Sequence, residues 1–172
     1  MFASEVELSY NQHMQQFFTQ NSEVIFRLVL ALVLGMAIGA ERLFVHKEAG
    51  MKTHSLVSIG SAVFILISEI MAQKYANFPG FNPTIMASQI IVGIGFLGAG
   101  SIMLQGNRLL GLTTAGGLWV TAGIGMACGF GLFSLAIIAT VLVLFIFVAM
   151  NIFEKPIKEI SNHNGVGDNI QN

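Results

Sequence analysis

The feature that most constrains this chain is a long stretch almost without charge. Between Lys74 and Glu154 the only charged side chain is that of Arg108. Of all 172 residues, 54% are hydrophobic and 10% are charged, whereas an ordinary soluble domain has about 25% charged residues. Such a stretch cannot supply the surface of a water-soluble protein. We therefore predict that a lipid bilayer surrounds most of the chain.

Five apolar runs, each of 17 to 20 residues, follow one another along the sequence. About 20 helical residues cross a hydrocarbon core about 30 Å thick, and lipid cannot satisfy the backbone groups of isolated strands. The runs also lack the alternating pattern of a membrane barrel. Residues 24–150 are therefore predicted to form an all-α, polytopic membrane helix bundle with about five transmembrane helices. The predicted helices are 24–40, 55–72, 85–104, 112–130 and 132–150.

The basic residues of the connecting segments predict the orientation of the bundle. An odd number of crossings places three basic segments on one side, and basic loops face the cytoplasm. The N-terminus is therefore expected outside and the C-terminus in the cytoplasm. The basic residues on the cytoplasmic side are Arg42, Lys47, Lys52, Arg108, Lys155 and Lys158.

The two ends of the chain differ from the apolar centre. Residues 1–23 are polar, but apolar side chains recur near a 3.6-residue period, which indicates an amphipathic helix at 5–19 on the periplasmic membrane surface. A frayed tail is the alternative. Residues 151–172 are predicted to be a cytoplasmic tail, partly disordered because its end is rich in Asn and Gly.

The stretch IIVGIGFLGAGS contains Gly93, Gly95 and Gly98 in the order of a dinucleotide-binding fingerprint. That fingerprint needs an acidic residue about 20 positions later, and no Asp or Glu occurs between Glu69 and Glu154. We interpret the glycines instead as surfaces for close helix packing, and we expect the helix at 85–104 to be central. The predicted packing glycines are Gly35, Gly39, Gly93, Gly95, Gly98, Gly100, Gly125 and Gly129.

Polar groups inside the predicted spans give two further expectations. Arg27 and Glu69 lie near the outer ends of antiparallel helices, so we predict that they pair, unless each reaches the headgroups independently. Thr114, Thr121 and Cys128 form a stripe at seven-residue spacing. The threonine hydroxyls either bond to their own helix, or the stripe forms one wall of a polar pathway.

The chain lacks the residues that several classes of function require. All four histidines fall outside the predicted spans and the only aspartate is Asp168, so intramembrane proteolysis has no obvious catalytic groups. The last three predicted helices carry no carboxylate, which disfavours a Mg²⁺ cage. The net charge of −1 gives no support for nucleic-acid binding. We expect no catalytic residues, no metal site and no cofactor.

The connection after the first predicted helix is rich in charge. A solvated turn is the default structure for such a run, and its basic members could hold anionic lipid headgroups or a protein partner. The charged residues and histidine of this connection are Glu41, Arg42, Lys47, Glu48, Lys52 and His54.

Three stretches taken together carry a family resemblance. KEAGMKTHSLVSIGSAVF, QIIVGIGFLGAGSI and GLTTAGGLWVTAGIGMACGFG, in this order, resemble the MgtC/SapB membrane proteins of bacteria over residues 24–150. Asn82-Pro83-Thr84-Ile85 stands where many members have Asp-Pro-x-Arg, and Lys52 stands where the family usually has Arg. The chain is expected to be the short, SapB-like form without the cytoplasmic C-terminal domain.

The resemblance implies a multi-pass protein of the bacterial inner membrane that is linked to magnesium homeostasis and virulence. It favours a non-enzymatic, oligomeric protein that regulates a membrane partner. The alternative is a small channel or transporter with a pathway near Gln89, Thr114, Thr121 and Glu69. The functional candidates that it implies are Glu41, Arg42, Lys52, Thr53, His54, Gln89, Thr113 and Thr114.

Overall fold

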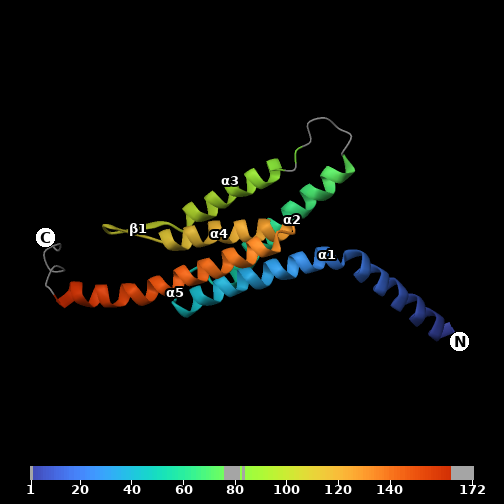
Figure 1. Ribbon diagram of the computed structural model, residues 1–172, viewed down its shortest axis with the longest axis horizontal. Helices are drawn as coiled ribbons and strands as arrows, with labels where there is room; N and C mark the ends of the chain where they lie inside the picture. Colours follow the sequence, from blue (N-terminus) through green and yellow to red (C-terminus); the bar gives the residue numbers. More distant parts are fainter. Residues whose placement is uncertain (1, 76–81, 83, 164–172) are drawn as a thin grey trace.

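The computed structural model describes residues 2–75, 82 and 84–163, and the side chains of residues 21–75, 82 and 84–152. This part of the chain forms a bundle of five helices with one short antiparallel hairpin (Figure 1). The prediction of an all-α helix bundle is confirmed. The elements in order are α1 (Phe2–Phe44), α2 (Met51–Lys74), α3 (Thr84–Gly100), β1 (Met103–Gln105), β2 (Arg108–Leu110), α4 (Leu112–Gly129) and α5 (Phe133–His163).

The helices differ in how far they could reach across a bilayer. Asn21–Phe44, Met51–Lys74 and Phe133–Ile152 are long and apolar enough to cross a membrane. α3 is apolar but has 17 residues, and α4 has 18. At 1.5 Å per residue these two helices rise about 25–27 Å, slightly less than a hydrocarbon core of about 30 Å. Five crossings and a cytoplasmic C-terminus stay predictions.

α4 is the central helix of the bundle, because it contacts α1, α2, α3 and α5. Its small residues let neighbours approach on several sides, and Gly117, Gly125 and Gly129 are all buried. The prediction that α3 is central is wrong. α3 lies along the outside of α4 (Figure 1) and buries only Ile94 and Gly98.

The hairpin between α3 and α4 was not predicted, because the apolar run at 85–104 was interpreted as one helix. α3 ends at Gly100, and Met103 pairs with Leu110 across an antiparallel ladder. Gly106 opens the two-residue turn with a φ of 59°, a left-handed conformation that favours glycine. A turn at Gly106-Asn107 therefore folds the end of the run back as a strand.

The helices also extend beyond their predicted ends. α1 continues to Phe44 and α2 begins at Met51, so the connection between them is shorter than the expected 41–54. Residues 2–23 of the predicted N-terminal segment belong to α1, whose first part projects away from the bundle in Figure 1. Its position on a membrane surface stays a prediction. α5 continues past residue 150 to His163, and the predicted disorder at 164–172 lies outside the described residues.

Candidate functional site

A buried ion pair lies where α1 packs against α5. Arg42 Nε donates a hydrogen bond to Glu41 Oε2 at 2.5 Å, and the two side chains are only 2% and 11% exposed. Asn151 Nδ2 donates to the other carboxylate oxygen, Glu41 Oε1, at 2.9 Å. The Arg42 guanidinium carbon lies 3.5 Å from the centre of the Phe147 ring. We call these four residues the Glu41–Arg42 cluster.

The length of α1 and its close approach to α2 place these charges in the interior. α1 runs past its predicted end, so Glu41 and Arg42 lie in its last turns instead of in a loop. A Cβ on Gly39 would lie 2.5 Å from Met51 Cα, which shows how closely the end of α1 meets the start of α2. The prediction of a solvated turn is therefore wrong for Glu41, Arg42 and His54. The remaining charged residues of the segment, Lys47, Glu48 and Lys52, are exposed.

His54 extends the polar interior from α2 to α4. Its side chain is fully buried, and Nδ1 lies 2.8 Å from Thr121 Oγ1. The Thr121 hydroxyl donates to the Gly117 carbonyl at 2.8 Å, so this threonine bonds to its own helix and to the histidine. His54 also lies inside α2, which corrects the expectation that every histidine is outside the spans.

Gly117 brings His54 close to the Glu41–Arg42 cluster. A Cβ on Gly117 would lie 3.4 Å from His54 Cε1 and 3.2 Å from Phe147 Cζ. The imidazole and the ring beneath Arg42 therefore flank the same glycine. Within the described side chains, three buried atoms on adjacent faces of α2 make no hydrogen bond: His54 Nε2, Ser55 Oγ and Ser58 Oγ. The interior of α2 is thus polar but incompletely paired.

The other predicted functional residues lie elsewhere. Thr53 and Thr114 line a cavity of about 380 Å³ together with Glu48 and Ser101. Lys52 and Thr113 are exposed. The structure brings together Glu41, Arg42 and His54, whereas these four predicted residues face the cavity or the surface.

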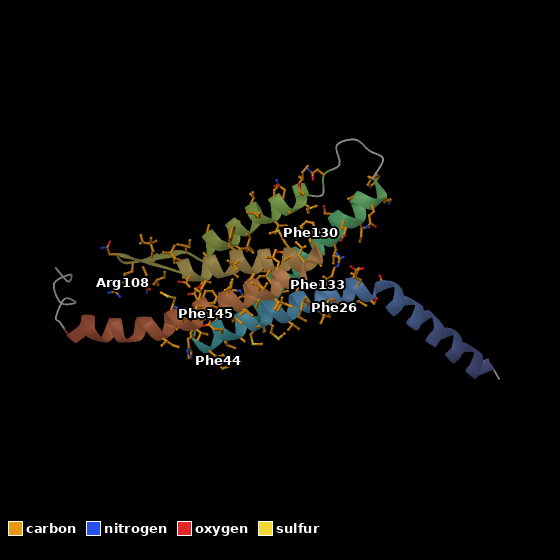
Figure 2. The ribbon with its side chains drawn as sticks, in the orientation of Figure 1. Phe26, Phe44, Arg108, Phe130, Phe133 and Phe145 are labelled. Atoms are coloured by element: carbon orange, nitrogen blue, oxygen red, sulfur yellow. The ribbon has the colours of Figure 1, made fainter. Side chains whose placement is uncertain are left out.

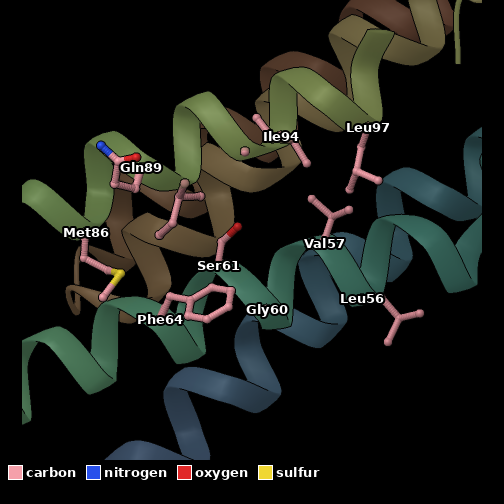
Figure 3. A pocket seen from close by; sticks show the side chains of 11 residues that line it. Leu56, Val57, Gly60, Ser61, Phe64, Met86, Gln89, Ile94 and Leu97 are labelled. Atoms are coloured by element: carbon pink, nitrogen blue, oxygen red, sulfur yellow. The ribbon is translucent and has the colours of Figure 1, made fainter. Parts of the chain in front are cut away.

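Gln89 lies at an apolar groove of about 440 Å³ between α2 and α3. Gly60 and Gly93 also line this groove, and its other residues are largely apolar. Figure 3 shows the Gln89 amide pointing away from α2. Gln89 is therefore not part of the polar interior around His54.

A second polar contact holds the opposite end of the bundle. Arg27 Nη1 donates to Glu69 Oε2 and to the Gly129 carbonyl, both at 2.7 Å, and the guanidinium also pairs with Glu23. The predicted pair of Arg27 and Glu69 is thus brought together. Arg27 also binds the C-terminal end of α4, where a cation is favoured.

Aromatic packing accompanies the Arg27 contact. The rings of Phe26 and Phe133 meet edge to face, with their centres 5.1 Å apart. Figure 2 labels both rings where α1 meets the start of α5. Offset or edge-to-face pairs of this kind add about 0.5–1.5 kcal/mol beyond area burial, so this end of the bundle is also firmly packed.

The predicted packing glycines fall into three groups according to how closely they meet a neighbouring helix. Gly35, Gly39, Gly125 and Gly129 face neighbouring helices so closely that an added Cβ would lie within 3 Å of another atom. Gly98 makes ordinary contact with Ala115. For the remaining three, an added Cβ would meet nothing within 4 Å: Gly93, Gly95 and Gly100.

Sequence reasoning missed the α5 side of the site. Phe147 and Asn151 are four residues apart, so they lie on one face of the helix. Asn151 directly follows the last apolar run. A polar residue at the end of an apolar helix could have indicated a polar contact there. The burial of Ser55 and Ser58 depends on the close approach of α1 and α4 and does not follow from the sequence of α2 alone.

Comparison with known proteins places the chain among bacterial membrane proteins. The family model for the MgtC family matches residues 28–156. The chain is 37% identical to the "Putative magnesium transporter YhiD" of Escherichia coli K12 over 145 residues, which cover 83% of this chain and 66% of that protein. No solved structure matches.

Two proteins named MgtC are also similar. The protein of Salmonella typhimurium LT2 is 46% identical over 120 residues, covering 70% of this chain and 49% of the relative. The protein of Brucella abortus is 41% identical over 130 residues, covering 76% and 50%. The chain thus spans about half to two thirds of the length of these relatives. A match of this extent shows that the chain belongs to the MgtC family.

Proposed function

We propose that this protein is a non-enzymatic, oligomeric protein of the bacterial inner membrane that regulates a membrane partner in magnesium homeostasis. Through that role it supports growth under magnesium limitation and inside host cells. Membership of the MgtC family and the relative with the name "Putative magnesium transporter YhiD" support the link to magnesium. The choice between a regulator and a transporter depends on the interior of the bundle.

The close contact of α1, α2 and α4 favours a regulator over a transporter. α2 lies between Gly35 of α1 and Gly125 of α4, and an added Cβ at either glycine would collide with the α2 backbone near Ser58. Helices that approach this closely leave little room for a hydrated ion. The structure therefore supports a sealed interior along this part of α2.

The four residues proposed for a transport pathway lie in different parts of the bundle, and two of them are bonded to other groups. Glu69 is paired with Arg27, and Thr121 is bonded to His54 and Gly117. Gln89 lies at the groove between α2 and α3, while Thr114 lines the cavity beside Glu48. These groups do not line one common cavity among the described residues, which disfavours a shared pathway.

Magnesium flux through the purified protein tests this choice. We expect Mg²⁺ uptake by proteoliposomes to equal that of empty liposomes, and to stay equal with Gln89→Ala and Glu69→Ala. Uptake would be followed with a Mg²⁺-sensitive dye inside the vesicles, and an added ionophore would show that the dye responds. Protein-dependent uptake that either variant reduces would establish the transporter alternative instead.

The partner itself requires a second experiment. With a photo-crosslinking residue at an exposed position such as Val141, we expect cross-linked products in bacterial membranes that contain a different membrane protein. Products that contain only further copies of this chain, from every exposed helix tested, would contradict regulation of a partner.

A further inference from the structure

The β1–β2 hairpin changes from apolar to polar along its length. Its base is the pair Met103 and Leu110, and its tip is the pair Gln105 and Arg108 beside the Gly106-Asn107 turn. Between them, Leu104 lies opposite Leu109, and these two side chains are 72% and 60% exposed. Directly opposed residues of a ladder share one face, so one face of the hairpin is wholly apolar.

The hairpin begins where a transmembrane helix would leave the hydrocarbon. α3 rises about 25 Å over its 17 residues, and a three-residue strand adds about 10 Å. Together they exceed a hydrocarbon core of about 30 Å. The hairpin projects beyond the start of α4 (Figure 1). The hairpin lies in the connection between the third and fourth predicted helices, which the basic residues predict to be on the cytoplasmic side.

Two physical constraints fix the medium around the hairpin. Its exposed Leu and Met side chains disfavour bulk water. Its ladder has two strands in the described part of the chain, so both outer edges carry unpaired backbone groups, which disfavour hydrocarbon. The headgroup layer satisfies both constraints, because water there reaches the backbone while acyl chains begin a few ångströms away.

The positive charge at the hairpin tip favours contact with anionic lipid headgroups. Arg108 is the one charged residue between Lys74 and Glu154, and it lies at the hairpin tip (Figure 2). Apolar side chains of the adjoining helices are exposed as well, among them Phe96 of α3 and Leu112 of α4. We infer that the hairpin is an interfacial anchor, with Leu104 and Leu109 toward the acyl chains and Arg108 on the phosphate of an anionic phospholipid. This inference does not depend on the regulatory role proposed above.

Depth-dependent quenching tests the inference on the full chain. Trp119 is the one tryptophan, so Trp119→Phe gives a background into which Leu104→Trp is placed. In vesicles of brominated phospholipids, we expect bromines near the glycerol end of the chain to quench this tryptophan more strongly than bromines near the chain end. Val141→Trp, at an exposed position of α5, is the matched deep control, for which the order should reverse. Leu109→Trp repeats the test should Leu104→Trp fail to fold.

Other results of the quenching experiment would overturn the anchor. Quenching by aqueous iodide without quenching by bromines would place the hairpin in water. Shielding from both quenchers would mean that a protein, either a partner strand or a second copy, covers the ladder. Either result rejects the lipid assignment.

Arg108→Gln tests the headgroup contact. With Leu104→Trp as the reporter, the preference for brominated phosphatidylglycerol over brominated phosphatidylcholine should fall about fivefold, as expected for one basic residue at an anionic surface. An unchanged preference would reject the phosphate contact of Arg108.

Discussion

Arg42→Ala is expected to lower the free energy of unfolding by about 3–5 kcal/mol, the usual effect of removing one partner from a buried ion pair. The variant leaves the Glu41 carboxylate almost buried, with Asn151 as its remaining hydrogen-bond donor among the described side chains. It also removes the cation from the Phe147 ring. Equilibrium unfolding of the purified protein in mixed micelles, followed by circular dichroism, measures the change.

Two further variants give this prediction its controls. Lys52 is exposed at the start of α2, so Lys52→Ala should change the stability by no more than about 0.5 kcal/mol. Combining Glu41→Gln with Arg42→Ala should destabilise the protein by less than the sum of the two single effects, because the double variant leaves no unpaired charge. If Arg42→Ala and Lys52→Ala had equal effects, the buried ion pair would not stabilise the bundle.

Gly125→Ala is expected to destabilise the bundle by about 3 kcal/mol, at the upper end of the range for overpacked sites. Its Cβ would lie 2.1 Å from the Ser58 carbonyl oxygen and 2.8 Å from Ser58 Cα. These are backbone atoms of α2, so a side-chain rotation cannot relieve the collision. The helices must move apart, and the contacts around Ser58 and His54 weaken with them.

Gly123→Ala on the same helix is the matched control. An added Cβ at Gly123 would meet nothing within 4 Å. Alanine is a better helix former than glycine, so this variant should be neutral or more stable by up to about 1 kcal/mol. The same unfolding assay compares the two. Equal destabilisation by both substitutions would mean that helix flexibility, and not close packing, explains the need for Gly125.

The fold could be predicted from the sequence because the bilayer imposes strong local rules. Apolar runs of sufficient length must be helices in lipid, and the antiparallel order of the first two placed Arg27 and Glu69 at similar depth. Glycines at four-residue spacing in α1 and α4 marked two surfaces that the structure packs closely, at Gly35 and Gly125. These predictions need only one helix or one pair of neighbouring helices.

What could not be predicted depends on several elements at once. Glu41, Arg42 and His54 look like loop residues in the sequence, and their burial requires α5 to lie across the end of α1. The glycines of α3 resembled those of α4, but glycine composition does not tell which faces find a neighbour. The hairpin was missed because Met103 and Leu104 continue an apolar run, and only the turn at Gly106 interrupts it.

The length of α1 has a consequence for how the bundle can move. Arg27 and Arg42 lie on this single helix, about 22 Å apart along its axis. Near one end of the bundle Arg27 is bonded to Glu69 of α2, and near the other end Arg42 lies over the Phe147 ring of α5 while Asn151 of α5 donates to Glu41. A helix is stiff along its axis, so sliding α1 by one turn, about 5.4 Å, would shift both arginines out of register together. Contacts near both ends of the bundle therefore oppose movement of α1 along its own axis. The peripheral α3 buries only Ile94 and Gly98, so less packing opposes a tilt of this helix.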